Sequence, residues 1–228
     1  MKVLITGASK GIGFFLMQKL SAAGYEVFGT YCSTLPSIEY QPYFTKVDIN
    51  NQTQVANWIK NSVSGDDEII LINCVGTNYN ALAHKADIEK WKELIDINLI
   101  GTFRMISTIL PYMQHKGFGR IINFSSVVAQ KGIPGTSAYA ASKSALWGLT
   151  KCIAVENAQK GITINNLNLG YFNIGMISEV PSEILASIKK NIPYQELGDP
   201  ENILNAVKFL IISDYITGTS IDINGGLF

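Results

Sequence analysis

Near its amino end the chain reads Lys2-Val3-Leu4-Ile5-Thr6-Gly7-Ala8-Ser9-Lys10-Gly11-Ile12-Gly13. A short apolar run leads into a turn with three glycines, and an amphipathic run from Phe14 to Ala23 comes next. This order predicts a strand, a glycine-rich turn and a helix, in which the backbone passes close to a pyrophosphate and the helix N-terminus binds it. The alternative is an ordinary tight turn between a strand and a helix.

Strands and helices alternate along the rest of the chain. Apolar patterns predict helices over 14–23, 52–63, two stretches within 81–116 (with a possible kink at Pro111), 137–160 and 200–213, and a less regular segment over 171–191. They predict strands over 2–6, 26–31, 43–47, 68–74, 119–125, 161–169 and 220–224. The alternation is typical of βαβ units. We therefore expect an α/β fold with one Rossmann-type, doubly wound parallel sheet of about seven strands, helices on both faces, and a single domain over residues 1–228.

Composition restricts the classes of function. Of 228 residues 47% are hydrophobic and 16% charged, and the formal net charge is 0, which is typical of a globular protein with one sizeable core. Because basic residues form no run longer than pairs such as Lys189-Lys190, we expect no nucleic-acid surface. The longest apolar runs, 69–75 and 207–212, are far shorter than the ~20 residues of a membrane span, so we expect no membrane association. The first apolar run is too short for a signal peptide.

Cysteine and histidine usage points to a reduced, metal-free protein. Cys32, Cys74 and Cys152 are widely separated and show no metal-like spacing, so we expect reduced thiols and a cytoplasmic location. His84 and His115 are too few for a histidine-based zinc site, and we expect them on surface helices.

Glycine or polar residues follow several of the predicted strands. They are Gly7–Gly13, Asp48, Asn73–Gly76, Ser126 and Gly170. The carboxyl ends of parallel strands share one edge of the sheet, and ligands bind outside that edge. We therefore expect these residues to line one crevice.

The end of the second predicted strand favours NADP(H) over NAD(H). An acidic residue near this position holds the ribose 2′-hydroxyl in NAD-binding folds. Here the chain reads Thr30-Tyr31-Cys32-Ser33, and the next acid is Glu39. Lys10, inside the glycine turn, can pair with a 2′-phosphate, although the alternative is a solvated loop cation.

Tyr139 and Lys143 lie four residues apart in the predicted helix over 137–160. Residues at this spacing share a helix face. A phenol titrates near pH ~10, and a neighbouring cation lowers that pKa. The pair is therefore a candidate proton donor with a cation that tunes it. The alternative is a pair of surface residues, which is what most such pairs are.

Together these motifs resemble the short-chain dehydrogenase/reductase family. The glycine turn matches, Tyr139 follows Ser126 by 13 residues, and Lys143 follows Tyr139 by four. Asn98 falls where the family has its fourth catalytic residue. The resemblance covers the whole chain, including its ending over 216–226. Within the family the chain is most similar to NADPH-dependent 3-oxoacyl-[acyl-carrier-protein] reductases, through residues 119–128 and 215–218.

The resemblance implies a role for each catalytic candidate. Tyr139 would protonate the carbonyl oxygen as hydride arrives from the nicotinamide, and Lys143 would lower the tyrosine pKa and hold the nicotinamide ribose. Ser126 would hydrogen-bond the substrate oxygen, and Asn98 would anchor a water that relays protons. The alternatives are a hydroxyl that caps a turn for Ser126 and a bond to helix backbone for Asn98. Ser125 is the neighbouring candidate, but only Ser126 has the family spacing.

The resemblance also implies a set of cofactor-binding residues. They are Gly7, Ser9, Lys10, Gly11, Ile12, Gly13, Tyr31, Cys32, Ser33, Asp48, Ile49, Asn73, Cys74, Val75, Gly76, Tyr139, Lys143, Gly170 and Phe172.

Three positions depart from the family pattern. The family's Asn-Asn-Ala-Gly is Asn73-Cys74-Val75-Gly76 here, and its Pro-Gly is Leu169-Gly170. Ile174 stands where a threonine usually meets the nicotinamide carboxamide, which removes a hydrogen bond worth roughly 0.5–1.5 kcal/mol. Cys74 can be read as a redox thiol or as a small buried side chain, and free cysteine favours the second reading.

A short apolar segment over about 171–197 is the expected substrate lobe, suited to an acyl chain or simply packed on the core. We therefore expect reduction of a 3-oxoacyl thioester on acyl carrier protein, or of another small carbonyl compound; a non-catalytic NADP(H)-binding regulator is the alternative from another class. An acidic carrier would need a basic patch, for which Arg104, Lys116, Arg120 and Lys131 are candidates. The family resemblance implies a homotetramer or homodimer.

Overall fold

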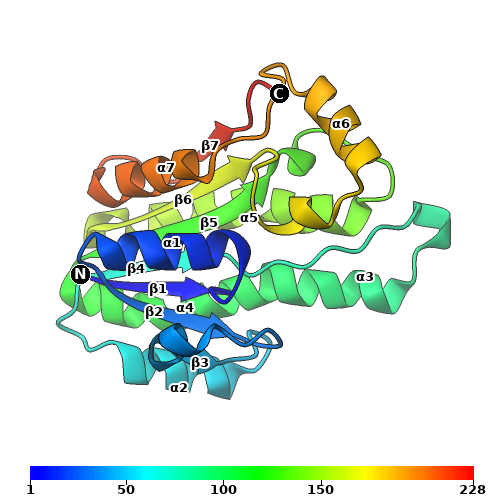
Figure 1. Ribbon diagram of the computed structural model, residues 1–228. Helices are drawn as coiled ribbons and strands as arrows, with labels where there is room; N and C mark the ends of the chain where they lie inside the picture. The colour runs from blue at the N-terminus through cyan, green and yellow to red at the C-terminus, as the bar shows by residue number, and fades with distance from the viewer.

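The seven strands form one sheet in which every neighbouring pair is parallel, in the order β3-β2-β1-β4-β5-β6-β7 (Figure 1). This computed structural model describes residues 1–228, apart from the side chain of Glu179. The strands are β1 (Lys2–Thr6), β2 (Glu26–Tyr31), β3 (Phe44–Lys46), β4 (Ile69–Asn73), β5 (Gly119–Ser126), β6 (Ile162–Leu169) and β7 (Ser220–Ile223). The predicted α/β fold is confirmed.

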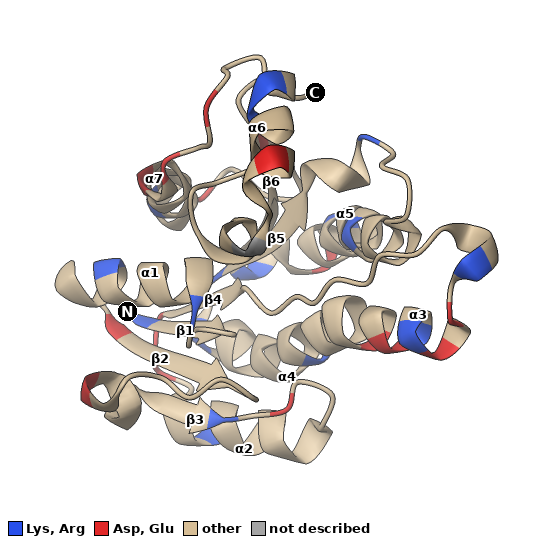
Figure 2. Ribbon diagram, turned by 45° about the vertical axis from the view of Figure 1, so that its right-hand side comes forward, with Lys and Arg blue, Asp and Glu red and all other residues tan. Residues whose placement is uncertain are grey.

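Helices cover both faces of the sheet (Figure 1). They are α1 (Gly11–Ala22), α2 (Gln52–Ser62), α3 (Ile88–Ile95), α4 (Gly101–Lys116), α5 (Ser137–Asn157), α6 (Ser182–Asn191) and α7 (Pro200–Ile212). Alternate residues of a strand face opposite sides. Val3 and Ile5 accordingly belong to a core under α1 and α7, whereas Leu4 belongs to a second core under α2, α4 and α5. Acidic and basic residues are interspersed over the helices (Figure 2).

The segment over 81–116 differs from the prediction of two helical stretches. Its first part is mostly irregular, with one short 3-10 turn, η2 (Ala83–Lys85), and α3 begins only after Asp87. The Asp87 carboxylate caps α3 by accepting from the N–H groups of Glu89 and Lys90. A π-helical turn, η3 (Asp96–Ile100), then leads into α4. Pro111 lies inside α4, and the helix continues past it to Lys116.

The helical run Ile88–Lys116 is long and apolar enough, by length and composition, to cross a membrane. The sequence prediction considered only uninterrupted apolar runs, and this helical run contains polar residues spread among the apolar ones. One face of α4 buries Met105, Ile109 and Met113 in the core under α2, α4 and α5. This is how the core helix of a sheet protein packs, so the run indicates no membrane span by itself.

The segment over 171–191 is more regular than predicted. It contains a 3-10 turn, η6 (Gly175–Glu179), and the helix α6. None of the residues of α6 is buried, and Leu185 and Ile188 are half-buried.

Arg120 is a structural residue at the amino end of β5. Its guanidinium donates to the carbonyl oxygens of Ile211 at 3.1 Å, Gly119 at 2.9 Å and Gly161 at 3.0 Å. It also lies 4.3 Å from the centre of the Phe118 ring. Burial lowers its pKa, although a guanidinium stays charged in proteins. Arg120 therefore joins α7 and β6 to β5 and is not available to a carrier protein.

Replacing Arg120 by alanine should destabilise the fold, because three backbone acceptors lose their donor. At about 1 kcal/mol or more for each bond to a charged group, we expect a loss of about 3 kcal/mol and a fall in Tm of roughly 6–12 °C. Thermal unfolding at fixed protein concentration measures this. Arg104→Ala is the control, since Arg104 donates to a single carbonyl, that of Ile49, and its loss should cost about a third as much. Equal losses of stability in the two variants would contradict the role of Arg120 in joining α7 and β6 to β5.

Candidate active site

The carboxyl end of β5 and the first turns of α5 bring three of the four catalytic candidates together. The Lys143 ammonium donates to the carbonyl oxygen of Phe124 at 2.7 Å. Ser126 ends β5, and its hydroxyl caps the turn that follows by accepting from the N–H of Val128 at 3.2 Å. It also acts on Tyr139, which lies one helical turn before Lys143, and lowers the pKa of that phenol. The i, i+4 spacing thus places phenol and ammonium on one helix face, with the ammonium 5.7 Å from the centre of the Tyr139 ring.

Asn98 joins this cluster from the π-helical turn η3. Its side-chain oxygen accepts from the N–H of Thr77 at 2.8 Å, and its amide donates to the Thr77 carbonyl at 3.0 Å and to Ser142 Oγ at 3.2 Å. A Cβ on Gly76 would lie 3.6 Å from Lys143 Nζ and 3.8 Å from Asn98 Oδ1. Gly76 therefore lies between the amide and the ammonium. π-Helical turns frequently mark functional sites.

Burial dominates the electrostatics of the pair. Lys143 is only 5% exposed, and burial lowers its pKa to about 8, with a smaller opposite effect from Cys74. Burial raises the pKa of the Cys74 thiol, which keeps it protonated at neutral pH and favours the reading as a small buried side chain.

The pKa of Tyr139 moves in the opposite direction to the expectation from sequence. Burial raises it, and the hydrogen bond with Ser126 lowers it only in part. Lys143 is not among the resolved causes of this shift. The chain alone therefore holds Tyr139 as a protonated phenol, which is the state that a proton donor needs.

The glycine turn has the geometry of an anion site. Gly7 and Gly11 have φ angles of +62° and +55°, which favour glycine, and a Cβ on Gly13 would lie 2.5 Å from the Gly7 carbonyl oxygen. The first turn of α1 has no acidic residue, and Lys10 at its N-cap makes no side-chain capping bond. Backbone N–H groups at this end of α1 thus remain for an anion, so the turn fits a dinucleotide pyrophosphate.

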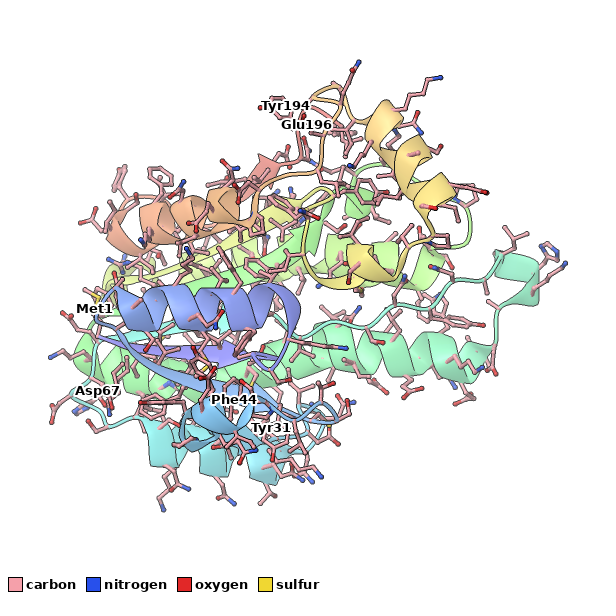
Figure 3. The ribbon with its side chains drawn as sticks, in the orientation of Figure 1. Met1, Tyr31, Phe44, Asp67, Tyr194 and Glu196 are labelled. Carbon is pink, nitrogen blue, oxygen red and sulfur yellow. The ribbon has the colours of Figure 1, made fainter. Side chains whose placement is uncertain are left out.

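The end of β2 lies against the glycine turn. The N–H groups of Ala8 and Gly7 donate to the Thr30 carbonyl at 2.8 Å and to Thr30 Oγ1 at 3.1 Å. Tyr31 and Phe44 come from the neighbouring strands β2 and β3 (Figure 3). Cys32, Ser33 and Lys10 are exposed, and the next acid in the chain after β2, Glu39, lies in the 3-10 turn η1 (Ile38–Tyr43). β2 itself thus ends without a carboxylate, while Asp48 follows Val47, whose N–H donates to the Tyr31 carbonyl at 2.8 Å. Beyond β3, Asp48 is exposed and accepts from the N–H of Asn50 at 2.9 Å.

The turn after β4 lies beside the first glycine. Thr6 Oγ1 accepts from the N–H groups of Cys74 at 3.1 Å and Val75 at 3.3 Å. A Cβ on Gly7 would lie 3.0 Å from the Val75 side chain, so valine fits here only because glycine faces it. Asn73 donates to Asn123 Oδ1 at 2.8 Å, while its own oxygen has no partner among the described residues. This buried oxygen is free for a donor from a ligand.

Some predicted cofactor residues face the core. Ile49 packs against Gly101, and the Phe172 ring packs against Gly198, leaving them 7% and 5% exposed. Any contact of these two with a cofactor would use mainly their backbone. Gly170 lies close to Asn224, because a Cβ there would be 2.7 Å from the Asn224 Cα.

Sequence reasoning missed the hydroxyls of Thr6 and Thr30, which hold the two turns that flank the first glycine. It also missed amides that are buried in β6, including Asn166 and Asn168. Their sequence signal is the run 166–169, in which amides alternate with leucines in a strand predicted to be buried.

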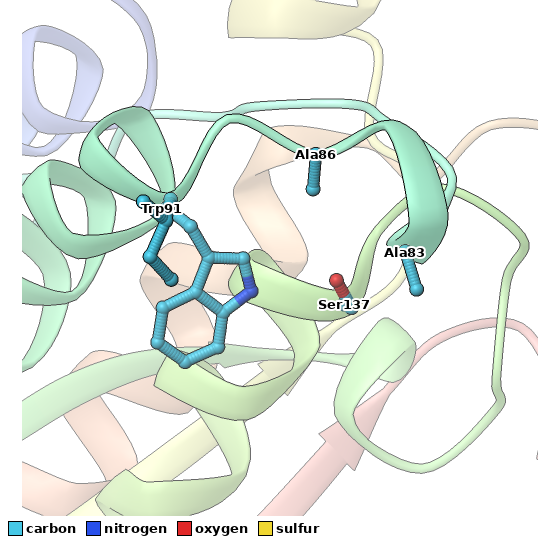
Figure 4. A pocket seen from close by; sticks show the side chains of 5 residues that line it. Ala83, Ala86, Trp91 and Ser137 are labelled. Carbon is cyan, nitrogen blue, oxygen red and sulfur yellow. The ribbon is translucent and has the colours of Figure 1, made fainter.

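A separate pocket of about 250 Å³ lies beside the start of α5, between η2 and α3 (Figure 4). It is lined by Ala83, Ala86, Ile88, Trp91 and Ser137. Neither Tyr139 nor Ser126 lines it, so this pocket is not the catalytic crevice.

Comparison with known proteins covers nearly the whole chain. A family model described as enoyl-(acyl carrier protein) reductase matches residues 7–228. The acetoacetyl-CoA reductase of Rhizobium meliloti (strain 1021) is 37% identical over 235 residues, covering 99% of this chain and 97% of the relative. The 3-oxoacyl-[acyl-carrier-protein] reductase FabG of Haemophilus influenzae is 34% identical over 236 residues, with the same coverage of both chains. The protein with that name from Staphylococcus epidermidis (strain ATCC 12228 / FDA PCI 1200) is 31% identical over 238 residues, covering 99% and 98%.

Removing the Lys143 charge should stabilise the protein. The pKa of Lys143 is about 8 in the folded protein and 10.5 ordinarily. The buried charge therefore destabilises the fold by its full amount below pH 8, and this loss shrinks between pH 8 and pH 10.5. At 1.36 kcal/mol per pKa unit, Lys143→Met should raise the free energy of unfolding by up to about 3 kcal/mol at pH 7, with a smaller gain at pH 9.5. Thermal unfolding at both pH values measures this.

Lys151→Met is the control, because Lys151 is an exposed lysine of the same helix. It should leave the stability nearly unchanged at both pH values. A Lys143→Met variant that is less stable than the wild type at pH 7 would show that the bond to Phe124 outweighs the burial of the charge.

Proposed function

Because the chain belongs to the short-chain dehydrogenase/reductase family, we propose that it is an NADPH-dependent ketoreductase. Its substrate is a 3-oxoacyl thioester, carried by acyl carrier protein, and its product is the 3-hydroxyacyl thioester. The names of the relatives, which are reductases of acetoacetyl-CoA and of 3-oxoacyl groups on acyl carrier protein, support this substrate class.

The observation that carries the proposal is the convergence of Ser126, Tyr139 and Lys143 where β5 meets α5. Bound nicotinamide supplies the hydride. The Tyr139 hydroxyl donates a proton to the substrate oxygen, and the Ser126 hydroxyl bonds the same oxygen and stabilises the charge that develops on it. The raised pKa of Tyr139 supports this direction of proton transfer, because the phenol holds its proton at neutral pH.

Lys143 holds positive charge close to the phenol. When Tyr139 gives up its proton, the nearby ammonium stabilises the phenolate that remains. The Lys143 side chain would also hold the ribose of a bound nicotinamide nucleotide. Asn98 stands across Gly76 from the ammonium, and we propose that it anchors the water through which Lys143 returns a proton to Tyr139.

NADPH is the proposed cofactor. The glycine turn and the start of α1 bind the pyrophosphate, and Lys10, with Cys32 and Ser33 at the end of β2, surrounds the 2′-phosphate. The absence of a carboxylate at the end of β2 supports this choice, because a carboxylate there would repel a phosphate.

The substrate lobe supports an apolar substrate. Met176 and Ile184, in η6 and α6, are each 55% exposed, which leaves apolar surface for an acyl chain. Reduction of another small carbonyl compound is the second candidate, since the same surface suits it. An enoyl thioester, which the description of the family model suggests, has its reacting double bond away from the oxygen that Ser126 and Tyr139 would serve.

We further propose that the protein acts in the cytoplasm as a homotetramer or homodimer. Ile100, Phe103 and Val155 on the helices η3, α4 and α5 are 42%, 48% and 83% exposed, which supports a partner surface. Of the basic candidates for carrier docking, the exposed Lys131 follows the turn after β5 and is the one closest in sequence to Ser126.

Tyr139→Phe should abolish turnover and leave cofactor binding intact. Removing the only proposed proton donor should lower kcat by at least about 100-fold, as general acid catalysis contributes 10²–10⁴-fold. NADPH oxidation at 340 nm is measured with 3-oxoacyl and enoyl thioesters on acyl carrier protein and on coenzyme A. Binding of NADPH is followed by its fluorescence.

Each result decides between the candidates. Oxidation with 3-oxoacyl thioesters that needs Tyr139 supports the proposal, and the better carrier identifies the natural one. Oxidation with enoyl thioesters alone would overturn it. A wild-type protein that binds NADPH but reduces no carbonyl compound would favour the non-catalytic regulator.

Lys10→Ala should weaken NADPH binding by about tenfold and leave NADH binding unchanged. One charge-assisted bond to the 2′-phosphate is worth about 1.5 kcal/mol, and NADH has no such phosphate. Fluorescence titration gives both affinities. Lys60→Ala is the control, because Lys60 lies in the last turn of α2, at the other end of that helix from the strand ends. A loss that is equal for NADH and NADPH would show that Lys10 does not read the phosphate.

A further inference from the structure

A chain of hydrogen bonds runs from the backbone of Lys143 to the edge of the sheet. Ser125 Oγ donates to the Lys143 carbonyl at 3.0 Å. The indole N–H of Trp147 lies 3.1 Å from both Ser125 Oγ and Asn168 Oδ1. The Asn168 amide then donates to Asp222 Oδ1 at 2.7 Å. We call these four side chains, Ser125, Trp147, Asn168 and Asp222, the indole clamp.

The sheet register holds the clamp together. Ser125, Asn168 and Asp222 are directly paired across β5, β6 and β7, so their side chains point to the same face of the sheet. Trp147 stands above them on α5, one helical turn after Lys143. Gln130, in the segment after Ser126, donates to the same oxygen of Asp222 at 2.9 Å. The clamp therefore joins the Lys143 turn of α5 to three strands and to the segment that follows the catalytic serine.

Donor chemistry gives the clamp a single orientation. An indole nitrogen can only donate, so Ser125 accepts from Trp147 and must use its one hydrogen for the Lys143 carbonyl. The single indole N–H is shared between Ser125 and Asn168, so Trp147 ties the serine that holds the helix to the neighbouring strand β6.

Two consecutive residues of β5 hold the Lys143 turn of α5. Phe124 accepts from the Lys143 ammonium, and Ser125 donates to the Lys143 carbonyl. Ser126, the next residue, acts on the Tyr139 hydroxyl and lowers the pKa of that phenol. The Ser125 contact fastens the backbone of α5 to the strand, whereas the Phe124 contact uses only the lysine side chain.

We propose that the indole clamp is a positioning unit for catalysis, which holds the Lys143 turn so that Tyr139 and Lys143 meet the substrate in the productive geometry. This inference rests on the proposed ketoreductase function. A misplacement of about 1 Å in a catalytic group can cost about 100-fold in rate. None of the four clamp residues needs to touch the substrate.

A second row of polar residues on the same face offers a matched control. Thr150 Oγ1 donates to Asn166 Oδ1 at 2.9 Å and accepts from Asn123 Nδ2 at 3.2 Å. These residues also join α5 to β5 and β6, and all three are 0% exposed. Thr150 lies two helical turns after Lys143, so this row fixes α5 without contacting the catalytic turn.

The test compares Trp147→Phe with Thr150→Val, each of which removes a bond between α5 and β6. Both should lower the Tm by a few degrees. Trp147→Phe should lower kcat by 10- to 100-fold with the Kd of NADPH within threefold of wild type. Thr150→Val should leave kcat within twofold. Ser125→Ala, a smaller change that keeps the indole, should reproduce the loss of kcat if Trp147→Phe does not fold.

A second readout does not need turnover. The pKa of the Lys143 ammonium is followed by NMR on 13C-labelled lysine, with Lys143→Met identifying the signal. Trp147→Phe or Ser125→Ala should shift that pKa by more than half a unit, whereas Thr150→Val should not. A wild-type protein that is inactive on every 3-oxoacyl thioester would contradict the proposed function, while the NMR comparison would still test whether the indole clamp positions Lys143. Equal effects of the clamp and control variants on kcat and on the Lys143 pKa would overturn the positioning role of the indole clamp.

Discussion

The contact between β5 and α5 is organised around the buried ammonium of Lys143, which forms no ion pair with a carboxylate of the described residues. Among the described residues its only hydrogen-bond partner is the backbone carbonyl of Phe124. Burying the charge lowers the stability of the folded state. A fold keeps such a group only if its surroundings hold it firmly. The carboxyl end of β5 does so, because Phe124 and Ser125 both bond to Lys143 in the second turn of α5.

The parallel sheet gives that contact its place in the molecule. Because every strand ends at the same edge, the glycine turn after β1, the turn after β4 and the serine at the end of β5 lie along one edge of the sheet. Thr6 and Thr30 bond the two turns beside Gly7 and so fix the anion site relative to the β5–α5 contact. The proposed cofactor site and the proposed proton donor therefore belong to one edge of the sheet.

The departures from the family pattern fit this edge. Val75 occupies the space that Gly7 leaves open, and Cys74 is a neutral thiol beside the buried ammonium. Polar side chains gather under α5 toward the carboxyl ends of β5 and β6, where Asn123, Ser125, Asn166 and Asn168 follow apolar residues of the same face. These buried side chains bond to one another and to Thr150 and Trp147 of α5, as buried polar groups do in folded proteins.

The sequence by itself determined the α/β alternation, the glycine turn and the spacing of Ser126, Tyr139 and Lys143, because these are local patterns whose periods of two and 3.6 residues follow from backbone geometry. It also placed α5 almost to the residue. Only the tertiary structure decided that the Tyr139 pKa is raised, that Arg120 is buried, and that Asn168 meets Asp222, 54 residues away. Burial and long-range hydrogen bonds depend on which strands become neighbours, and a local pattern contains no such information.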